Sequence, residues 1–220
     1  MSKKREVQVL DYSLCEELIS AISHGVGAGL SVAAAVLCIV KAARMHDAWA
    51  VVSVCVFGLS LILLYTISCV YHSLGKKLKG KKVLRVIDHC MVFVLIAGSY
   101  TPFCFVPLRG VPGFVMFGII WGLCAIGVTF NGIDVDKYQI VSAIVNILMG
   151  WAIVFEFGIL LRTVGLPCVL WLLGGGIAYS VGAILYGVGS KVKYMHSVFH
   201  FFCLAGSILH FFAIYLYVLN

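Results

Sequence analysis

Seven long apolar runs, separated by short polar connections, constrain the fold of this 220-residue chain more than any other feature. The hydrocarbon core of a bilayer requires about 20 apolar residues for one helical crossing. The runs lie near residues 22–40, 48–72, 87–107, 112–130, 138–161, 166–189 and 195–219. The sequence therefore predicts an all-α membrane protein that forms a bundle of seven transmembrane helices.

Composition supports a membrane protein with one compact domain. Hydrophobic residues make up 62% of the chain and charged residues 11%, against about 25% charged in an ordinary soluble domain. The short connections leave no room for a separate soluble domain. The first run lacks a small-residue cleavage site of the kind that ends a signal peptide. We therefore expect a cytoplasmic N-terminal arm over residues 1–17 and a seven-helix domain over 18–220.

The distribution of Lys and Arg predicts the orientation in the membrane. Twelve of the sixteen basic residues lie in the N-terminal arm and in the second, fourth and sixth connections. Basic connections stay in the cytoplasm, so the N-terminus is expected inside and the C-terminus outside. The run "KKLKGKK" at residues 76–82 is interpreted as a topology anchor near anionic lipid headgroups. We expect no nucleic-acid partner.

Ionisable side chains gather at the predicted cytoplasmic ends of four spans. Such groups are costly inside a membrane and are functional candidates for that reason. The second span ends with Ser68 and His72, the third begins with Asp88 and His89, the seventh begins with His196 and His200, and the first carries Glu16, Glu17 and His24. The opposite leaflet receives little more than Glu156 and His210. The pattern predicts one polar site close to the cytoplasmic surface.

The histidines of this group have the spacing of metal ligands. His196 and His200 lie four residues apart, which places both rings on one face of a helix. A catalytic zinc ion takes three protein ligands and keeps one position open, and His72 can supply the third. Asp88 lies at the same depth, where it can act as a hydrogen-bond acceptor or general base, and Ser68 can bond the water or a substrate carbonyl. The alternative is that these histidines pack helices together.

The other polar residues favour simpler roles. His89 points about 100° away from Asp88 around the helix, so packing or a hydrogen bond is favoured over metal binding. For Glu17 and His24, a role in supporting the metal ligands or in tethering helices is favoured over direct metal contact. His210 lies about 15 Å beyond His200 along the helix, too far to join the same site. The nine cysteines stand singly with no CxxC pair and are expected to be free thiols in apolar surroundings.

Five motifs resemble those of the hemolysin III family, the bacterial branch of the progestin and adipoQ receptor (PAQR) superfamily. They are "EELISAISHGVGAGLS" in the first span, "SCVYH" in the second, "IDHC" and "AGSYTPF" in the third and "HSVFH" in the seventh. The resemblance implies a multi-pass protein of the bacterial inner membrane. It also implies zinc bound by His72, His196 and His200, with Asp88 contacting the ion through water and Ser68 nearby.

The superfamily is similar to the alkaline ceramidases, which implies zinc-dependent hydrolysis of a membrane lipid amide or ester. In that interpretation the metal ligands are His72, His196 and His200, the catalytic residues are Asp88 and Ser68, and the partner is a membrane lipid. Three alternatives remain open. A sensor or regulator of membrane lipid homeostasis could keep zinc and a lipid cavity without turnover. A pore-forming hemolysin or a metal transporter would require polar groups through both leaflets, and the one-sided cluster disfavours both.

Overall fold

The structure, a computed structural model, describes residues 12–189 and 192–220, and these contain helices but no strands. The α-helices are α1 (Leu14–Arg44), α2 (Ala48–Ser73), α3 (Lys79–Phe105), α4 (Val111–Asp134), α5 (Gln139–Trp151), α6 (Phe157–Thr163), α7 (Gly165–Gly189) and α8 (Met195–Ala213). A 3₁₀ turn over Ala152–Glu156 joins α5 to α6, and a π turn over Ile214–Val218 extends α8. Seven helical segments are therefore long and apolar enough to cross a membrane, because α5, the 3₁₀ turn and α6 form one of them. The predicted seven-helix fold is confirmed.

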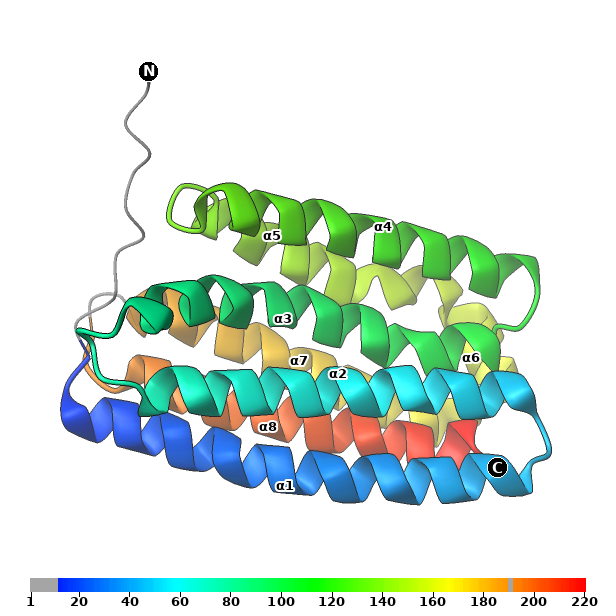
Figure 1. The fold of residues 1–220 in the computed structure, drawn as a ribbon. Coiled ribbons are helices and arrows are strands. Elements are labelled where there is room, and N and C mark those ends of the chain that lie inside the picture. Colours follow the sequence, from blue (N-terminus) through cyan, green and yellow to red (C-terminus); the bar gives the residue numbers. More distant parts are fainter. Residues whose placement is uncertain (1–11, 190–191) are drawn as a thin grey trace.

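The spans run alternately up and down, and consecutive spans are neighbours (Figure 1). α8 packs on α7 and also lies beside α1. α4 and α5 lie on the side of α3 that faces away from α1 and α2 (Figure 1). We call the end at which α1 and α8 begin the N-end, and the end at which α8 finishes the C-end. α2 finishes at the N-end and α3 begins there, so the N-end brings together the segments that carry the predicted site.

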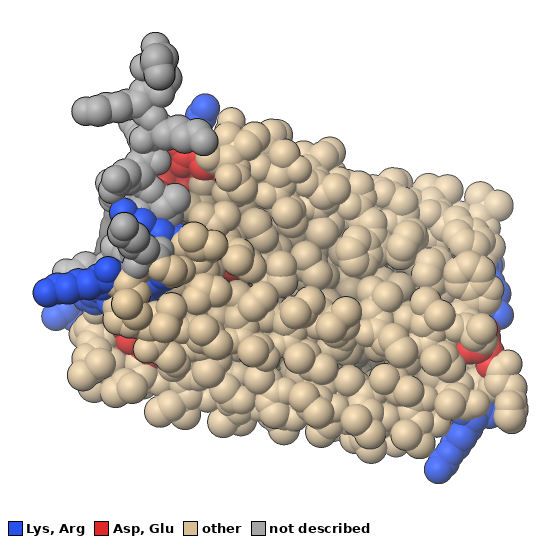
Figure 2. All heavy atoms as spheres, in the orientation of Figure 1, with Lys and Arg blue, Asp and Glu red and all other residues tan. Residues whose placement is uncertain are grey.

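Charged side chains lie at the two ends of the bundle, with an almost uncharged band between them (Figure 2). Many large apolar side chains on this band are exposed, including Leu59, Ile119 and Leu148. Exposed apolar surface of this kind is stable against lipid acyl chains and not against water. The band therefore identifies the part of the bundle that lies in the membrane, whereas the assignment of the N-end to the cytoplasm stays a prediction.

Glu16 fixes the start of α1 and the approach to α8 together. Ser13 caps α1 in a capping box, since Glu16 N donates to Ser13 Oγ and Ser13 N donates to Glu16 Oε2 at 2.9 Å. The other carboxylate oxygen of Glu16 accepts a bond of 2.7 Å from the backbone N–H of Tyr194, one residue before α8. α1 thus begins inside the segment predicted to be the N-terminal arm, while residues 1–11 of that arm lie outside the described residues.

A glycine contact fixes α8 against α7 at the level of the histidines. A Cβ atom on Gly189 would lie 2.9 Å from the backbone nitrogen of His196. Only a glycine allows this approach without a shift of the backbone. Ser20 and Ser197 bond each other at 3.2 Å, and Ser197 Oγ also donates to the carbonyl oxygen of Glu16. The first turn of α8 is therefore fixed from both α7 and α1.

Candidate metal centre

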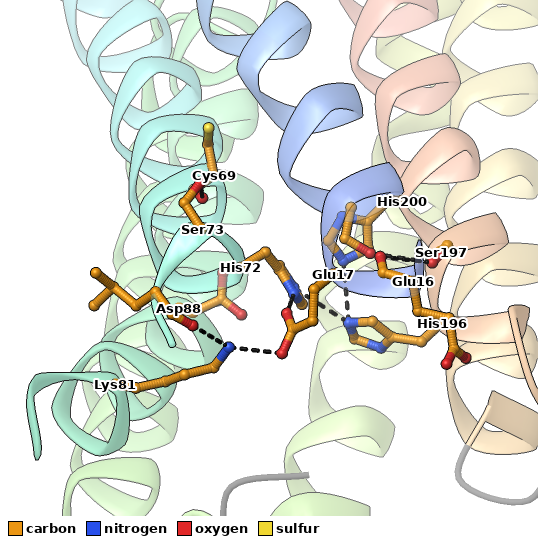
Figure 3. A network of polar contacts seen from close by, with 12 residues as sticks. Glu16, Glu17, Cys69, His72, Ser73, Lys81, Asp88, His196, Ser197 and His200 are labelled. Carbon is orange, nitrogen blue, oxygen red and sulfur yellow. Dashed lines mark hydrogen bonds and ion pairs between the residues drawn. The ribbon is translucent and has the colours of Figure 1, made fainter. Parts of the chain in front are cut away.

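Three histidines from two helices converge at the N-end with their Nε2 atoms facing one another (Figure 3). The Nε2 atoms of His196 and His72 are 3.4 Å apart, and those of His200 and His196 are 3.1 Å apart. One ligand atom from each of the three side chains lies within 4.8 Å of the others, and all three residues are buried. With Zn–N bonds of about 2.0–2.1 Å and tetrahedral angles, ligand nitrogens lie about 3.3 Å apart. The cluster can hold a metal ion without a large rearrangement.

Glu17 orients His72 for this role. Its Oε2 atom accepts a 2.7 Å hydrogen bond from His72 Nδ1, across 55 positions of sequence. The carboxylate can only accept, so the proton lies on Nδ1 and the lone pair of His72 Nε2 faces the other two histidines. Metal-binding histidines commonly donate their second nitrogen to a carboxylate in this way. The contact therefore supports the interpretation of His72 as a ligand rather than as a packing residue.

Lys81 completes the support of Glu17. Its Nζ atom donates to Glu17 Oε1 at 2.6 Å and to the carbonyl oxygen of Leu74 at 2.8 Å. Lys81 is fully buried. The interpretation of Lys81 as a loop anchor at lipid headgroups is wrong, because α3 begins at Lys79 and its first turns bring Lys81 into the interior beside Glu17. Its charge neutralises a carboxylate that would otherwise be buried next to histidines alone.

Two aromatic contacts hold the rings of α8 in place. The His200 ring stacks on the ring of His24 with centroids 3.8 Å apart. The His196 ring stacks on Tyr12 at 4.6 Å. Burial raises the pKa of the Tyr12 phenol above its ordinary value, so this ring is neutral at physiological pH. His24 thus contacts a predicted ligand through its ring face, in agreement with the tethering role expected for it.

Asp88 and Ser68 lie close to the cluster without belonging to it. Asp88 is on α3, and its side chain lines a cavity that also borders His196. Ser68 is buried on α2, one turn before His72. The group of side chains with metal-ligand separations contains His72, His196 and His200 and neither of these two residues. Their predicted catalytic roles stay predictions.

His89 forms hydrogen bonds, as expected from its direction on α3. Its Nδ1 donates to the carbonyl oxygen of Arg85 at 2.8 Å. Its Nε2 therefore accepts from Tyr186 Oη at 3.0 Å, and Tyr186 in turn accepts from Gln139 Nε2 at 2.8 Å. This chain links α3, α5 and α7 beside Asp88. The prediction of a hydrogen-bonding role for His89 is confirmed.

Sequence reasoning identified the three histidines from their spacing and depth, and it left the role of Glu17 open. The position of Glu17 in the first span, among other polar residues at the same depth, was the available signal. The signal for Lys81 was weaker, since five other basic residues lie near it between positions 76 and 85. The burial of Lys81 and its contact with Glu17, which the sequence does not reveal, distinguish it in the structure.

Comparison with known proteins finds relatives along nearly the whole chain. A family model described as "Haemolysin-III related" matches residues 12–211. The chain is 39% identical over 206 residues to a "Hemolysin-3 homolog" of Bacillus subtilis (strain 168), covering 94% of this chain and 96% of that protein. It is 39% identical over 204 residues to "Hemolysin-3" of Bacillus cereus, covering 93% and 92%.

A more distant relative comes from animals. The human "Monocyte to macrophage differentiation factor" is 26% identical over 191 residues, covering 82% of this chain and 78% of that protein. The match to the family model extends from just before α1 into the last turns of α8. The chain is therefore a membrane protein of the hemolysin III family, within the PAQR superfamily.

Proposed function

We propose that this protein is a zinc-dependent hydrolase that acts on a membrane lipid amide or ester. The observation that carries the proposal is the convergence of three buried Nε2 atoms at one end of a cavity inside a membrane-spanning bundle. Neutral imidazole is the commonest metal ligand in proteins. Three such ligands in a tetrahedral arrangement favour zinc and leave one position for water or substrate.

The cavity has the character of a lipid site. Its walls come mainly from α3, α5, α7 and α8 and are largely apolar, with Leu95, Phe103 and Leu172 among them. α5 lies in the least buried of the seven spans, which favours entry of a chain from the membrane on that side. Asp88 and His196 line the N-end of the same cavity. A lipid whose hydrocarbon chain filled the cavity would bring its polar linkage to these residues.

The residues of the chain would then divide the chemical work. His72, His196 and His200 would hold zinc, which when bound supplies a Lewis acid for the substrate carbonyl and lowers the pKa of water to about 7. Asp88 would accept a proton from the attacking water and pass it to the leaving amine or alcohol as the C–N or C–O bond breaks. Ser68 would donate a hydrogen bond to the carbonyl oxygen. Glu17 would keep His72 in the required tautomer.

The first test is the metal content of the purified chain. We expect about one zinc per chain in the parent protein and almost none in the His196→Ala/His200→Ala variant, measured by mass spectrometry after purification without chelator. His46→Ala is the matched control, because His46 lies in the connection between α1 and α2 at the C-end. Absence of metal from the parent after resupply of zinc would overturn the proposal.

The second test separates a hydrolase from a lipid sensor. Asp88→Asn should retain zinc and lose release of fatty acid from a lipid amide or ester by at least about 100-fold, the lower range for loss of a general base. Asp47→Asn, at the C-end, controls for the loss of a carboxylate. A fully active Asp88→Asn variant would exclude the proposed base. Zinc without turnover of any lipid in the parent would favour the sensor.

A further inference from the structure

The cavity beside the histidine cluster is long, and three of its walls give the same length. Its lining extends along α8 from His196 to His210, along α7 from Leu172 to Tyr186 and along α3 from Asp88 to Phe103. Each stretch covers fourteen or fifteen positions, which at 1.5 Å per residue is about 21–23 Å of helix. The cavity therefore extends from the level of the cluster deep into the membrane-spanning band.

The end of the cavity towards the C-end is closed by packed side chains. Phe103, Ile153 and Leu172 line this end, with exposed fractions of 2%, 6% and 7%, and we call them the floor. Further towards the C-end, Leu160 and Ile214 are fully buried and do not line the cavity. Protein interiors are close-packed, with few voids. A hydrocarbon chain that extends from the cluster along the cavity therefore meets the floor.

Tyr100 on α3 builds part of this floor. In an α-helix the N–H of Ile153 would donate to the carbonyl oxygen of Met149, but here the Tyr100 hydroxyl group lies between them. It accepts from Ile153 N at 2.9 Å and donates to Met149 O at 2.6 Å. Backbone groups freed inside a membrane must find partners within the protein. Tyr100 thus stabilises the 3₁₀ turn that carries Ile153 at the end of the cavity.

The distance to the floor corresponds to a definite chain length. An extended hydrocarbon chain advances about 1.25 Å per carbon, given C–C bonds of about 1.5 Å and tetrahedral angles, so about 21 Å holds about 16 carbons. We propose that this cavity selects lipids by the length of their saturated chain, with an optimum near 16 carbons and with Phe103, Ile153 and Leu172 as the end stop. The inference rests on the proposed function for the position of the polar linkage at the cluster.

The test measures binding with probes that a hydrolase cannot cleave. Saturated primary alcohols from decanol to docosanol compete with radiolabelled hexadecanol for the full chain in lipid nanodiscs. They are compared at equal mole fraction in the bilayer, so that their different partition from water does not enter. We expect hexadecanol or its nearest neighbours to bind most tightly. Dodecanol and docosanol should bind at least about fivefold more weakly, because a short chain leaves a void and a long chain meets the floor.

Gly176→Leu should shorten the preferred chain. Gly176 lines the cavity four residues nearer the N-end than Leu172, which is about 6 Å or about five carbons. A Cβ atom there would meet only the ring of Trp151, at 3.9 Å, so the backbone need not shift. Gly174→Leu is the matched control on the same helix, because Gly174 does not line the cavity. It should leave the optimum where it is in the parent.

Leu172→Ala should lengthen the preferred chain by about two carbons, since it opens the floor by the volume of the removed side-chain atoms. A general loss of folding or binding cannot produce a shift in this direction, so this variant guards against damage to the fold by Gly176→Leu. Equal affinity for all lengths in the parent, or failure of every alcohol to compete, would overturn the inference. An optimum that stays unchanged in both variants would overturn it as well.

The length selection and the hydrolase fail in different measurements. Release of fatty acid from a lipid amide or ester is measured on the same preparation as the competition. A parent that prefers one length but hydrolyses no lipid would keep the length selection and refute the hydrolase. A parent that hydrolyses lipid but binds every length equally would keep the hydrolase and refute the length selection.

Discussion

The two ends of the cavity carry histidines in opposite situations. At the N-end, His72, His196 and His200 direct their Nε2 atoms at one another, and Glu17 fixes the tautomer of His72. Towards the C-end, His210 donates from Nε2 to a backbone carbonyl, and its Nδ1 is buried with no hydrogen-bond partner among the described residues. The residue type is the same. Converging lone pairs favour a cation, whereas one isolated lone pair favours a hydrogen-bond donor.

The support behind each histidine differs in the same way. The N-end uses buried charge, with Lys81 and Glu17 in direct contact. The C-end uses no charged partner for His210, which is held by the shape of Gly175 and the Tyr179 ring and by the hydrogen bond to the carbonyl oxygen of Leu172. Loss of support should therefore cost more at the N-end, where a charge is left buried, than at the C-end, where a ring is displaced. Four substitutions test this comparison.

Lys81→Met should have the largest effect. It leaves the Glu17 carboxylate buried beside His72 without its cation, and removal of one partner of a buried pair typically costs about 3–5 kcal/mol. The free energy of unfolding in detergent, from denaturant titration, measures the loss. Lys82→Met is the matched control, because Lys82 is only partly buried. If Lys81→Met/Glu17→Gln is no more stable than Lys81→Met, the uncompensated carboxylate is not the cause.

Glu17→Gln should weaken zinc binding by about 10–100-fold, the usual effect of removing the carboxylate behind a metal-binding histidine. The amide can still accept from His72 Nδ1 but no longer supplies a negative charge. Competition with a zinc chelator gives the affinity. Glu156→Gln, in the 3₁₀ turn that follows α5, should have no such effect. Unchanged affinity in Glu17→Gln would show that Glu17 serves the packing of α1 only.

Gly175→Ala should destabilise the C-end by about 1–3 kcal/mol, as overpacking of a filled site does. The added methyl group would displace the His210 ring, while the zinc content should not change. Gly174→Ala is the matched control, since a Cβ atom there would meet only Leu209 Cδ1 at 3.7 Å, an ordinary contact. Equal stability of the two variants would contradict the fixed position of His210.

Asp47→Asn should have the smallest effect, within about 1 kcal/mol, because the ion pair between Asp47 and Arg109 is partly exposed. Burial has the largest single effect and raises the pKa of the Asp47 carboxyl, but the hydrogen bonds from Arg109 and from the backbone of Trp49 and the charge of Arg109 together outweigh it, so the pKa is lowered. A lowered pKa in the folded state gives stability that is present above the unfolded pKa, near 3.9, and is lost as pH falls through the folded value.

Melting temperatures of Asp47→Asn and the parent should therefore differ at pH 7 and converge at an acidic pH below the folded-state pKa of Asp47. Asn still accepts from the backbone N–H of Trp49 and preserves the cap of α2, which isolates the ion pair from the cap. A difference of the same size at both pH values would exclude the ion pair as its source.

Much of the site could be predicted from the sequence because its signals are local. The spacing of His196 and His200 places both rings on one helical face, and hydropathy fixes the depth of His72 and Asp88. The role of Glu17 was harder to predict, since its partner His72 is 55 residues away. Their contact depends on the rotation of α1 against α2. Lys81 was misassigned, because a run of basic residues next to a span ordinarily lies at headgroups.

By itself, the sequence determined the seven spans, the end of the bundle at which polar groups gather and the three candidate ligands. Apolar length and helical spacing are properties of one segment at a time, which is why they could be predicted. Only the tertiary structure decided that Glu17 and Lys81 support His72 and that one cavity joins the histidine cluster to His210. These features depend on how whole helices rotate and pack against one another, and that choice minimises buried charge and void across the entire bundle.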